Sequence, residues 1–140
     1  MAGSRVSVYY DNMLTKAISW GKTREDARKM LKSLSGKTHM IYSGVSIIDA
    51  KARKELLDYE ITKVKFRKIS GKEISKYVAT GEPMDKAGSY AIQGLGATFV
   101  SKIDGCYSNV VGLPLFKLAE SLKKFGVDIF EYEKWTNYVE

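Results

Sequence analysis

The chain has 140 residues, of which 44% are hydrophobic and 28% charged, and its formal net charge at pH 7 is +7. This length fits one globular domain, and the apolar share excludes intrinsic disorder, which needs a chain too polar to form a core. The single cysteine, Cys106, excludes an internal disulfide, and with one histidine, His39, it excludes a zinc site of the usual Cys/His type.

The composition also restricts location and partners. The N-terminal stretch MAGSRVSVYY lacks the apolar core of a signal peptide, and no window reaches the roughly 18 apolar residues of a membrane span. With one unpaired cysteine, these features predict a cytoplasmic protein without a membrane partner. The positive charge favours an anionic partner, such as a nucleotide phosphate. Any bound metal is expected to be a hard ion held by carboxylates, Mg²⁺ or Mn²⁺.

In chain order, the hydrophobic pattern predicts alternating strands and helices. Residues 5–10 alternate as a strand does, and residues 23–34 carry an apolar stripe at helical spacing behind a capping box of Thr23 and Asp26. Residues 39–48 are apolar and rich in β-branched side chains, which indicates a buried strand.

The following segment, within residues 56–68, predicts a strand with one wet, basic face. Its cationic side chains alternate with apolar ones, in the order Lys63, Val64, Lys65, Phe66 and Arg67. A period of two is the signature of a strand whose two faces meet different surroundings. A solvated face is the expected role of these cations.

A second capping box, Ser70 with Glu73, predicts a short helix whose inward residues are Ile74, Tyr77 and Val78. The pattern further predicts a strand at 97–103, a helix that begins at Pro114 with Leu115, Leu118, Ala119 and Leu122 on one face, and a strand at 127–132. Because strands and helices interleave, the expected class is α/β or mixed α+β, in a single domain over residues 1–140.

Residues 80–96 break every periodicity and hold the polar side chains best suited to chemistry. Glu82, Asp85, Lys86 and Gln93 lie here among several glycines. Glycines let the backbone approach a ligand, carboxylates can hold Mg²⁺, a lysine can neutralise phosphate, and an amide can read a base edge. A solvated, glycine-rich connection is the alternative interpretation.

Several motifs at fixed spacing extend over residues 21–131. A Glu-Pro-x-Asp-Lys-Ala-Gly-x-Tyr-x-Ile-Gln-Gly core occupies residues 82–94, and Gly-x-Tyr-x-Asn-Val-Val-Gly-Leu-Pro occupies residues 105–114. Upstream lie Leu-Ser-Gly-Lys-Thr-His at residues 34–39 and Gly-Lys at residues 21–22. Together these motifs closely resemble the Maf (septum-formation Maf-like) family.

The resemblance implies a nucleoside triphosphate pyrophosphatase that cleaves the α–β bond and releases a nucleoside monophosphate and pyrophosphate, with Mg²⁺ or Mn²⁺ as cofactor. It implies pyrimidine substrates such as dTTP, UTP and CTP, or non-standard nucleotides. The implied fold is that of inosine triphosphatases: a long mixed sheet flanked by helices, with a cleft between two lobes. Homodimers are implied as well, and nucleic acid is not expected as a partner.

The resemblance also assigns substrate-binding residues. Lys22 and Lys86 are expected to contact phosphate, because cations stabilise the charge that builds on the leaving pyrophosphate. Gln93 is expected to recognise the base or a phosphate through its amide, and Thr38, from the Thr-His motif, is a further substrate-binding candidate. Structural roles are expected for three other residues of the matched segments, His39, Tyr107 and Asn109.

The candidates for the chemical step are Asp85, Glu82, Lys22 and Asp11, with Asp11 and Asp85 as metal ligands. A pairing of Glu82 with Lys86 is the structural alternative for that carboxylate. Asp11 has two interpretations. With Asn12 it stands for the family's Asp-Thr pair, whose aspartate is catalytic, or it belongs to the family's later Asp-Gly hairpin turn and the catalytic aspartate is missing.

The chain departs from the family pattern at its start, where nothing matches the Ser-x-Ser-Pro-Arg-Arg loop. It therefore resembles a Maf domain without its first βα unit, and we expect the loss of those arginines to weaken catalysis. The alternative function is a non-catalytic domain that binds nucleotide or acts as an interaction module. A basic nucleic-acid binder is a third interpretation, resting on the net charge and the basic strand alone.

Overall fold

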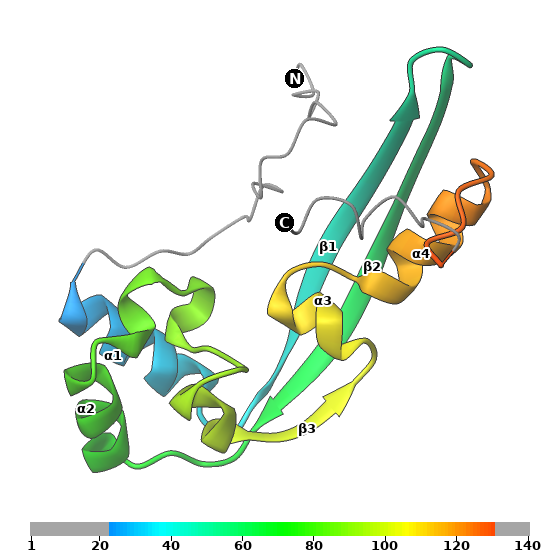
Figure 1. Ribbon diagram of the computed structural model, residues 1–140. Coiled ribbons are helices and arrows are strands. Elements are labelled where there is room, and N and C mark those ends of the chain that lie inside the picture. Colours follow the sequence, from blue (N-terminus) through cyan, green and yellow to red (C-terminus); the bar gives the residue numbers. More distant parts are fainter. Residues whose placement is uncertain (1–22, 131–140) are drawn as a thin grey trace.

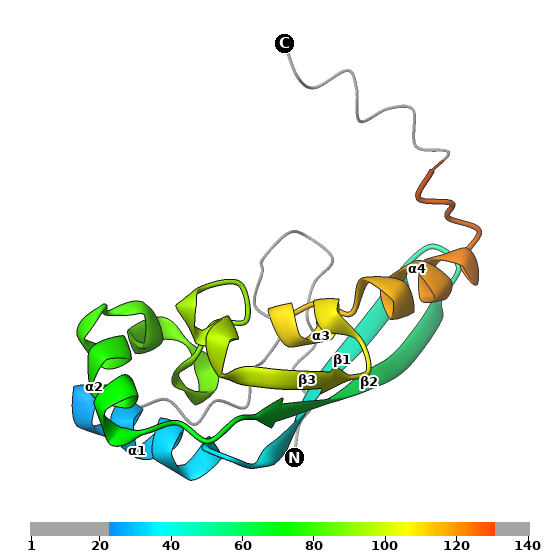
Figure 2. The same cartoon turned by 90° about the horizontal axis from the view of Figure 1, so that it is seen from below.

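The computed structural model describes residues 23–130 (Figures 1 and 2). Helices and strands are interspersed along this part of the chain, which has the mixed α/β class that the sequence predicts. The elements are α1 (Arg24–Leu34), β1 (Thr38–Asp49), β2 (Lys54–Phe66), α2 (Gly71–Ala79), the 3-10 turns η1 (Glu82–Asp85), η2 (Ala87–Ser89) and η3 (Leu95–Phe99), β3 (Val100–Asp104), α3 (Tyr107–Val111) and α4 (Leu115–Lys123).

The sheet of the described residues has three strands in the order β1-β2-β3, and both pairings are antiparallel. Thr38 lies opposite Lys65, and the register continues to the far end of a long hairpin. The predicted alternation is confirmed within β2: Val64 and Phe66 are buried, whereas Lys63 and Lys65 are exposed. Arg67, predicted on the same wet face, is half-buried and pairs with Glu73 at 2.8 Å. The mixed sheet that the resemblance implies would need strand pairings other than those within residues 23–130.

The helices lie at one end and on one face of the sheet. Helices α1 and α2 and the three 3-10 turns gather at one end of the sheet, and α3 and α4 lie along one face of the hairpin (Figures 1 and 2). The opposite face carries Met40, Tyr42 and Tyr59, which are 54%, 60% and 63% exposed. No described element covers that face.

Both predicted capping boxes are present and start the two helices of this end. The Thr23 hydroxyl accepts the Asp26 N–H at 3.2 Å, and the Asp26 carboxylate accepts the Thr23 N–H at 3.2 Å. Ser70 and Glu73 repeat the arrangement at α2. Each such cap contributes about 1 kcal/mol.

The core lies where α1 and α2 pack against the end of the sheet. Burial of a leucine- or phenylalanine-sized side chain contributes about 2 kcal/mol, so this cluster supplies most of the local stability. The inward residues predicted for α2 are all buried. The cluster comprises Ala27, Leu31, Val64, Phe66, Ile69, Ile74, Tyr77, Val78, Tyr90 and Phe99.

The C-terminal elements differ from the prediction. The predicted strand at 97–103 begins only at Val100, after the η3 turn. Residues 127–130 form no strand, so the prediction for this part is wrong. Gly126, at φ +72°, ends α4, and the Val127 N–H bonds back to the Leu122 carbonyl, which closes the helix. The predicted strand at 5–10, and residues 131–132, lie outside the described residues.

Two helices near the end of the chain also correct the prediction. Residues 107–111, for which the sequence pattern predicted no element, form the short helix α3. Pro114 caps α4 as expected, but Leu115 is 57% exposed and does not share the packed face predicted for it. Among the helices of residues 23–130, none has the length and hydropathy that a membrane crossing needs.

Candidate functional site

The irregular region at 80–96 is an ordered connection of three 3-10 turns between α2 and β3. Gly81 begins it with φ at +83°, a left-handed conformation that glycine adopts without strain. Pro83, the second residue of η1, is buried. This region carries four of the predicted site residues, which it holds in different environments.

Gln93 lies at the corner of a β-turn. The Gly94 N–H donates to the Ala91 carbonyl at 3.3 Å, which places Ile92 and Gln93 at the two central positions. The Gln93 side chain is exposed, and within residues 23–130 it makes no hydrogen bond. Its amide is therefore available to a ligand.

Glu82 lies beneath this turn and accepts three hydrogen bonds from the fold. The Tyr77 hydroxyl donates to Oε1 at 2.8 Å, the Gly96 N–H to Oε1 at 3.0 Å, and the Leu95 N–H to Oε2 at 2.9 Å. Burial alone would raise the pKa of this carboxyl, but the donors, led by Gly96 and Leu95, favour the charged form and lower it overall. The carboxylate is thus ionised and committed to the backbone.

Asp85 and Lys86 form an adjacent, more exposed pair. The Lys86 ammonium contacts both oxygens of Asp85 at 2.9 Å, and the Asp85 side chain is 76% exposed. An exposed ion pair contributes little to stability, so the ammonium can turn to an anionic ligand at small cost. The alternative pairing considered for Glu82, with Lys86, is not the one the structure makes.

Thr38 lies away from these residues, at the start of β1. It is on the open face of the sheet, the face that carries Met40, Tyr42 and Tyr59. It borders a hollow of about 250 Å³ together with Lys63, Lys65, Lys102 and Asp104. None of the residues 80–96 lines this hollow. The structure therefore brings Glu82, Asp85, Lys86 and Gln93 into one connection, and it does not bring Thr38 to them.

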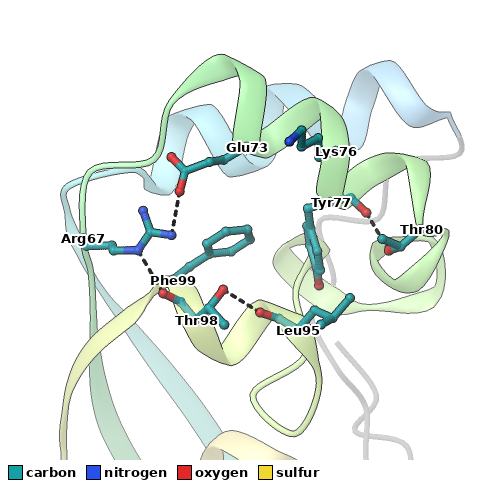
Figure 3. A pocket seen from close by; sticks show the side chains of 8 residues that line it. All are labelled: Arg67, Glu73, Lys76, Tyr77, Thr80, Leu95, Thr98 and Phe99. Carbon is teal, nitrogen blue, oxygen red and sulfur yellow. Dashed lines mark hydrogen bonds and ion pairs between the residues drawn. The ribbon is translucent and has the colours of Figure 1, made fainter.

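A second hollow, of about 260 Å³, lies between α2 and η3 (Figure 3). Arg67 crosses its edge, where its guanidinium donates to the Thr98 carbonyl at 2.9 Å and to Glu73 at 2.8 Å. Hydrogen bonds from Arg67 and Ser70 lower the pKa of Glu73 to about 2. These polar groups are occupied by one another, and no predicted site residue lines the hollow, which indicates a structural role.

The structural roles expected for His39 and Asn109 agree with their contacts. His39 Nε2 lies 3.0 Å from the Tyr90 hydroxyl, and its ring packs edge-on against Phe66 and Tyr90. Asn109 is fully buried and donates to the Thr62 hydroxyl at 2.9 Å. The contact between His39 and Tyr90 links β1 to the connection that carries Gln93.

The described residues do not by themselves form a divalent metal site. Asp85 is the exposed carboxylate among the predicted ligands, and within residues 23–130 no three His, Cys, Asp or Glu side chains gather. The other predicted metal ligand, Asp11, and the phosphate-contact candidate Lys22 both lie outside the described residues.

The sequence did not indicate the role of Tyr77 in this region. It predicted a buried helix residue, but its hydroxyl reaches both Glu82 and the Ala91 N–H, the latter at 3.4 Å. The available signal was the pair Gly94 and Gly96: a Cβ on Gly94 would lie 2.6 Å from the Glu82 carboxylate, and one on Gly96 would lie 2.7 Å from the Tyr77 hydroxyl.

Comparison with known proteins places these residues in a wider context. A sequence model of the family described as Maf-like protein matches residues 4–125. A dTTP/UTP pyrophosphatase of Clostridium botulinum (strain Loch Maree / Type A3) is 50% identical over 114 residues, covering 81% of this chain and 59% of the relative.

Two further relatives are also dTTP/UTP pyrophosphatases. That of Clostridium tetani (strain Massachusetts / E88) is 54% identical over 107 residues, or 76% of this chain and 56% of the relative. That of Pelotomaculum thermopropionicum is 51% identical over 106 residues, again 76% of this chain and 56% of the relative. The chain thus matches less than two thirds of the length of these relatives.

Proposed function

Because the chain belongs to the Maf-like protein family, we propose that it is a nucleoside triphosphate pyrophosphatase acting on pyrimidine nucleotides such as dTTP, UTP and CTP. It converts them to the nucleoside monophosphate and pyrophosphate. The observation that carries this proposal is the identity of 50% over 114 residues to a dTTP/UTP pyrophosphatase. The proposal is further supported by an exposed amide, Gln93, and a half-buried cation, Lys86, in one ordered connection.

The proposed chemistry assigns a task to each available group. Water attacks the α-phosphorus while negative charge builds on the departing pyrophosphate, and cations placed at that charge lower the barrier. Lys86 contacts the phosphates after turning from Asp85, and Lys22 is proposed for the same task. Gln93 reads the base or a phosphate through its amide, and Thr38 is proposed to contact a part of the substrate that extends to the sheet.

A requirement for Mg²⁺ or Mn²⁺ is part of the proposal, with Asp85 and Asp11 as ligands. Since residues 23–130 alone do not form the site, we assign no step to the ion. Glu82 is not proposed as a ligand, because three donors already occupy its oxygens. A homodimeric state and a cytoplasmic location, the latter in keeping with the free thiol of Cys106, complete the proposal.

A pyrophosphate-release assay tests the function directly. The purified chain is given dTTP, UTP, CTP, dATP, dGTP and ITP, with Mg²⁺, with Mn²⁺ and with a chelator. We expect metal-dependent turnover of the pyrimidine nucleotides, reduced on the order of 10²-fold in Lys86→Ala and Gln93→Ala. Lys72→Ala, which removes an exposed lysine on α2, is the matched control and should retain the activity.

Two results would count against this function. Absence of turnover from the folded chain with every nucleotide would refute the enzyme proposal, and calorimetric binding of a non-hydrolysable UTP analogue would then identify a nucleotide-binding domain. Equal losses in Lys86→Ala and Lys72→Ala would show that charge alone, and not the site, supports the activity.

A further inference from the structure

We propose that Tyr77 and Glu82 form a positioning clamp that fixes the turn carrying Gln93 and so maintains the discrimination between nucleobases. The inference rests on the proposed function, because it takes Gln93 as the group that reads the base. Neither residue of the clamp touches the nucleotide in this scheme. They act through the backbone of residues 91–96.

The clamp holds the turn at both ends. Before Gln93, the Ala91 N–H donates to the Tyr77 hydroxyl oxygen at 3.4 Å. After it, the Leu95 and Gly96 N–H groups donate to the two oxygens of Glu82 at 2.9 Å and 3.0 Å. The Tyr77 hydroxyl donates to Glu82 at 2.8 Å, which joins the two halves into one network.

The backbone lies so close to the clamp that a Cβ on Gly94 or Gly96 would force neighbouring atoms to shift. A Cβ added to Gly94 would lie 2.6 Å from the Glu82 carboxylate, and one added to Gly96 would lie 2.7 Å from the Tyr77 hydroxyl and 2.9 Å from the Ala91 backbone. Such distances are below van der Waals contact. Because neither glycine has a Cβ, the carboxylate and the hydroxyl can lie directly against the backbone of the turn. Such close contact restricts the movement of the turn.

The clamp is itself anchored in the core. Tyr77 is 5% exposed on α2, and its ring packs edge-on against Phe99 with centroids 4.9 Å apart. The charged groups that act on Glu82 are on its own turn, with Lys86 contributing an attraction that favours the carboxylate. An ionised Glu82 is thus held between a rigid helix and the backbone it supports.

Fixing the turn matters for selectivity more than for phosphate binding. An amide distinguishes uracil from cytosine only when its oxygen and NH₂ group are held toward the correct donor and acceptor on the base edge. A rigid hydrogen-bonding site rejects the wrong partner strongly because the buried polar groups are left unpaired. A mobile turn lets Gln93 turn to either base, whereas the phosphate contacts of lysines are little affected.

The test compares steady-state constants for UTP and CTP in Tyr77→Phe, Glu82→Gln and Gln93→Ala. Tyr77→Phe removes one hydroxyl and keeps the ring packing, and Tyr59→Phe makes the same change on the open face of the sheet. We expect the ratio of kcat/KM between the two bases to fall about tenfold in Tyr77→Phe and in Gln93→Ala. It should stay unchanged in Tyr59→Phe.

Two further measurements separate positioning from general stability. The double variant Tyr77→Phe with Gln93→Ala should lose no more selectivity than Gln93→Ala alone, because both changes remove one function. Hydrogen exchange at the Leu95 and Gly96 amides should accelerate in Glu82→Gln and in Tyr77→Phe but not in Tyr59→Phe. Tyr77→Phe keeps the test usable if Glu82→Gln fails to fold.

The outcomes distinguish this inference from the proposed function. If the chain is active and its ratio of kcat/KM for UTP and CTP is unchanged in Tyr77→Phe, the clamp is refuted and the enzyme proposal stands. An unchanged ratio in Gln93→Ala has the same meaning. A chain without turnover refutes the enzyme. The clamp is then judged by the ratio of Kd values for non-hydrolysable UTP and CTP analogues, and an equal ratio in wild type and Tyr77→Phe, or no binding, overturns it.

Discussion

Replacing Asn109 with aspartate is the sharpest test of how α3 is attached to the sheet. The Asn109 amide nitrogen donates to the Thr62 hydroxyl at 2.9 Å and to the carbonyls of Ile41 and Glu60 at 3.3 Å and 3.4 Å. Both Asn109 and Thr62 are 0% exposed. One side chain therefore joins the helix to two strands.

The change replaces an NH₂ donor with an oxygen of nearly the same shape. That oxygen faces two carbonyl acceptors and a hydroxyl whose proton is directed to the Cys106 carbonyl at 3.1 Å. Leaving buried polar groups unpaired costs about 1–3 kcal/mol, and a buried charge without a partner costs about 3–5 kcal/mol. We therefore expect Asn109→Asp to lose about 3–5 kcal/mol at pH 7, and Asn109→Ala about 1–3 kcal/mol.

The loss should depend on pH in a defined direction. Burial raises the pKa of the new carboxyl in the folded state above its unfolded value of about 3.9. The folded state then binds the proton more tightly, so the variant is least impaired in acid and loses stability as pH rises through the folded-state pKa. The difference from wild type should be smaller at pH 4.5 than at pH 7.

Urea unfolding followed by circular dichroism measures these differences. With a slope of about 1.5 kcal/mol per molar urea, a loss of 3 kcal/mol lowers the midpoint by about 2 M. Gln93→Glu is the matched control, since it makes the same amide-to-carboxylate change at an exposed position. An Asn109→Asp midpoint equal to that of Gln93→Glu would refute the argument that the buried hydrogen bonds of the Asn109 NH₂ group hold α3.

Two further predictions concern the neighbourhood of Gln93. Gly96→Ala should destabilise the chain by about 1–3 kcal/mol in thermal unfolding, because its Cβ meets the Tyr77 hydroxyl and the Ala91 backbone. Gly44→Ala, where a Cβ meets nothing within 4 Å, is the control, and equal losses would contradict the close approach. Burial lowers the pKa of His39 below its usual 6.5, so the unfolded state takes up the proton first and the free energy of unfolding should fall between pH 7 and 5.5. In His39→Gln this pH dependence should disappear from urea titrations. If the free energy of unfolding of the wild type did not change between pH 7 and 5.5, the imidazole would not be desolvated.

The elements nearest to local rules could be predicted from the sequence. The capping box of Thr23 and Asp26 and the stripe around Leu31 depend on residues three or four apart, so their geometry follows from the sequence alone. The alternation of Lys65 with Phe66 likewise follows from the two faces of a strand. The strand expected at 127–132, whose described residues 127–130 form none, could not be decided locally, because a strand forms only where another strand offers its backbone.

The candidate site shows the same division. The motif at 82–94 singled out candidate residues through its resemblance to a family, but it could not give their partners. The donors to Glu82 are backbone N–H groups of Leu95 and Gly96, and no side-chain pattern encodes where a backbone N–H will point. Asn109 was correctly expected to be structural, yet the strands it joins became visible only in the fold.

Glu82 and Asp85 illustrate why two carboxylates of one motif need separate assignments. Three donors surround Glu82, so its negative charge is already neutralised by dipoles that the fold keeps in place. Asp85 is largely exposed and lies against Lys86, whose ammonium can exchange an exposed carboxylate for phosphate with little loss. Removing the first charge strips hydrogen bonds from the backbone beside Gln93, whereas removing the second changes an exposed charge beside Lys86, the lysine that the proposed function assigns to phosphate binding. Proximity in the sequence thus joins two carboxylates with different surroundings: Glu82 is bonded to the backbone of the turn, and Asp85 lies exposed beside a lysine.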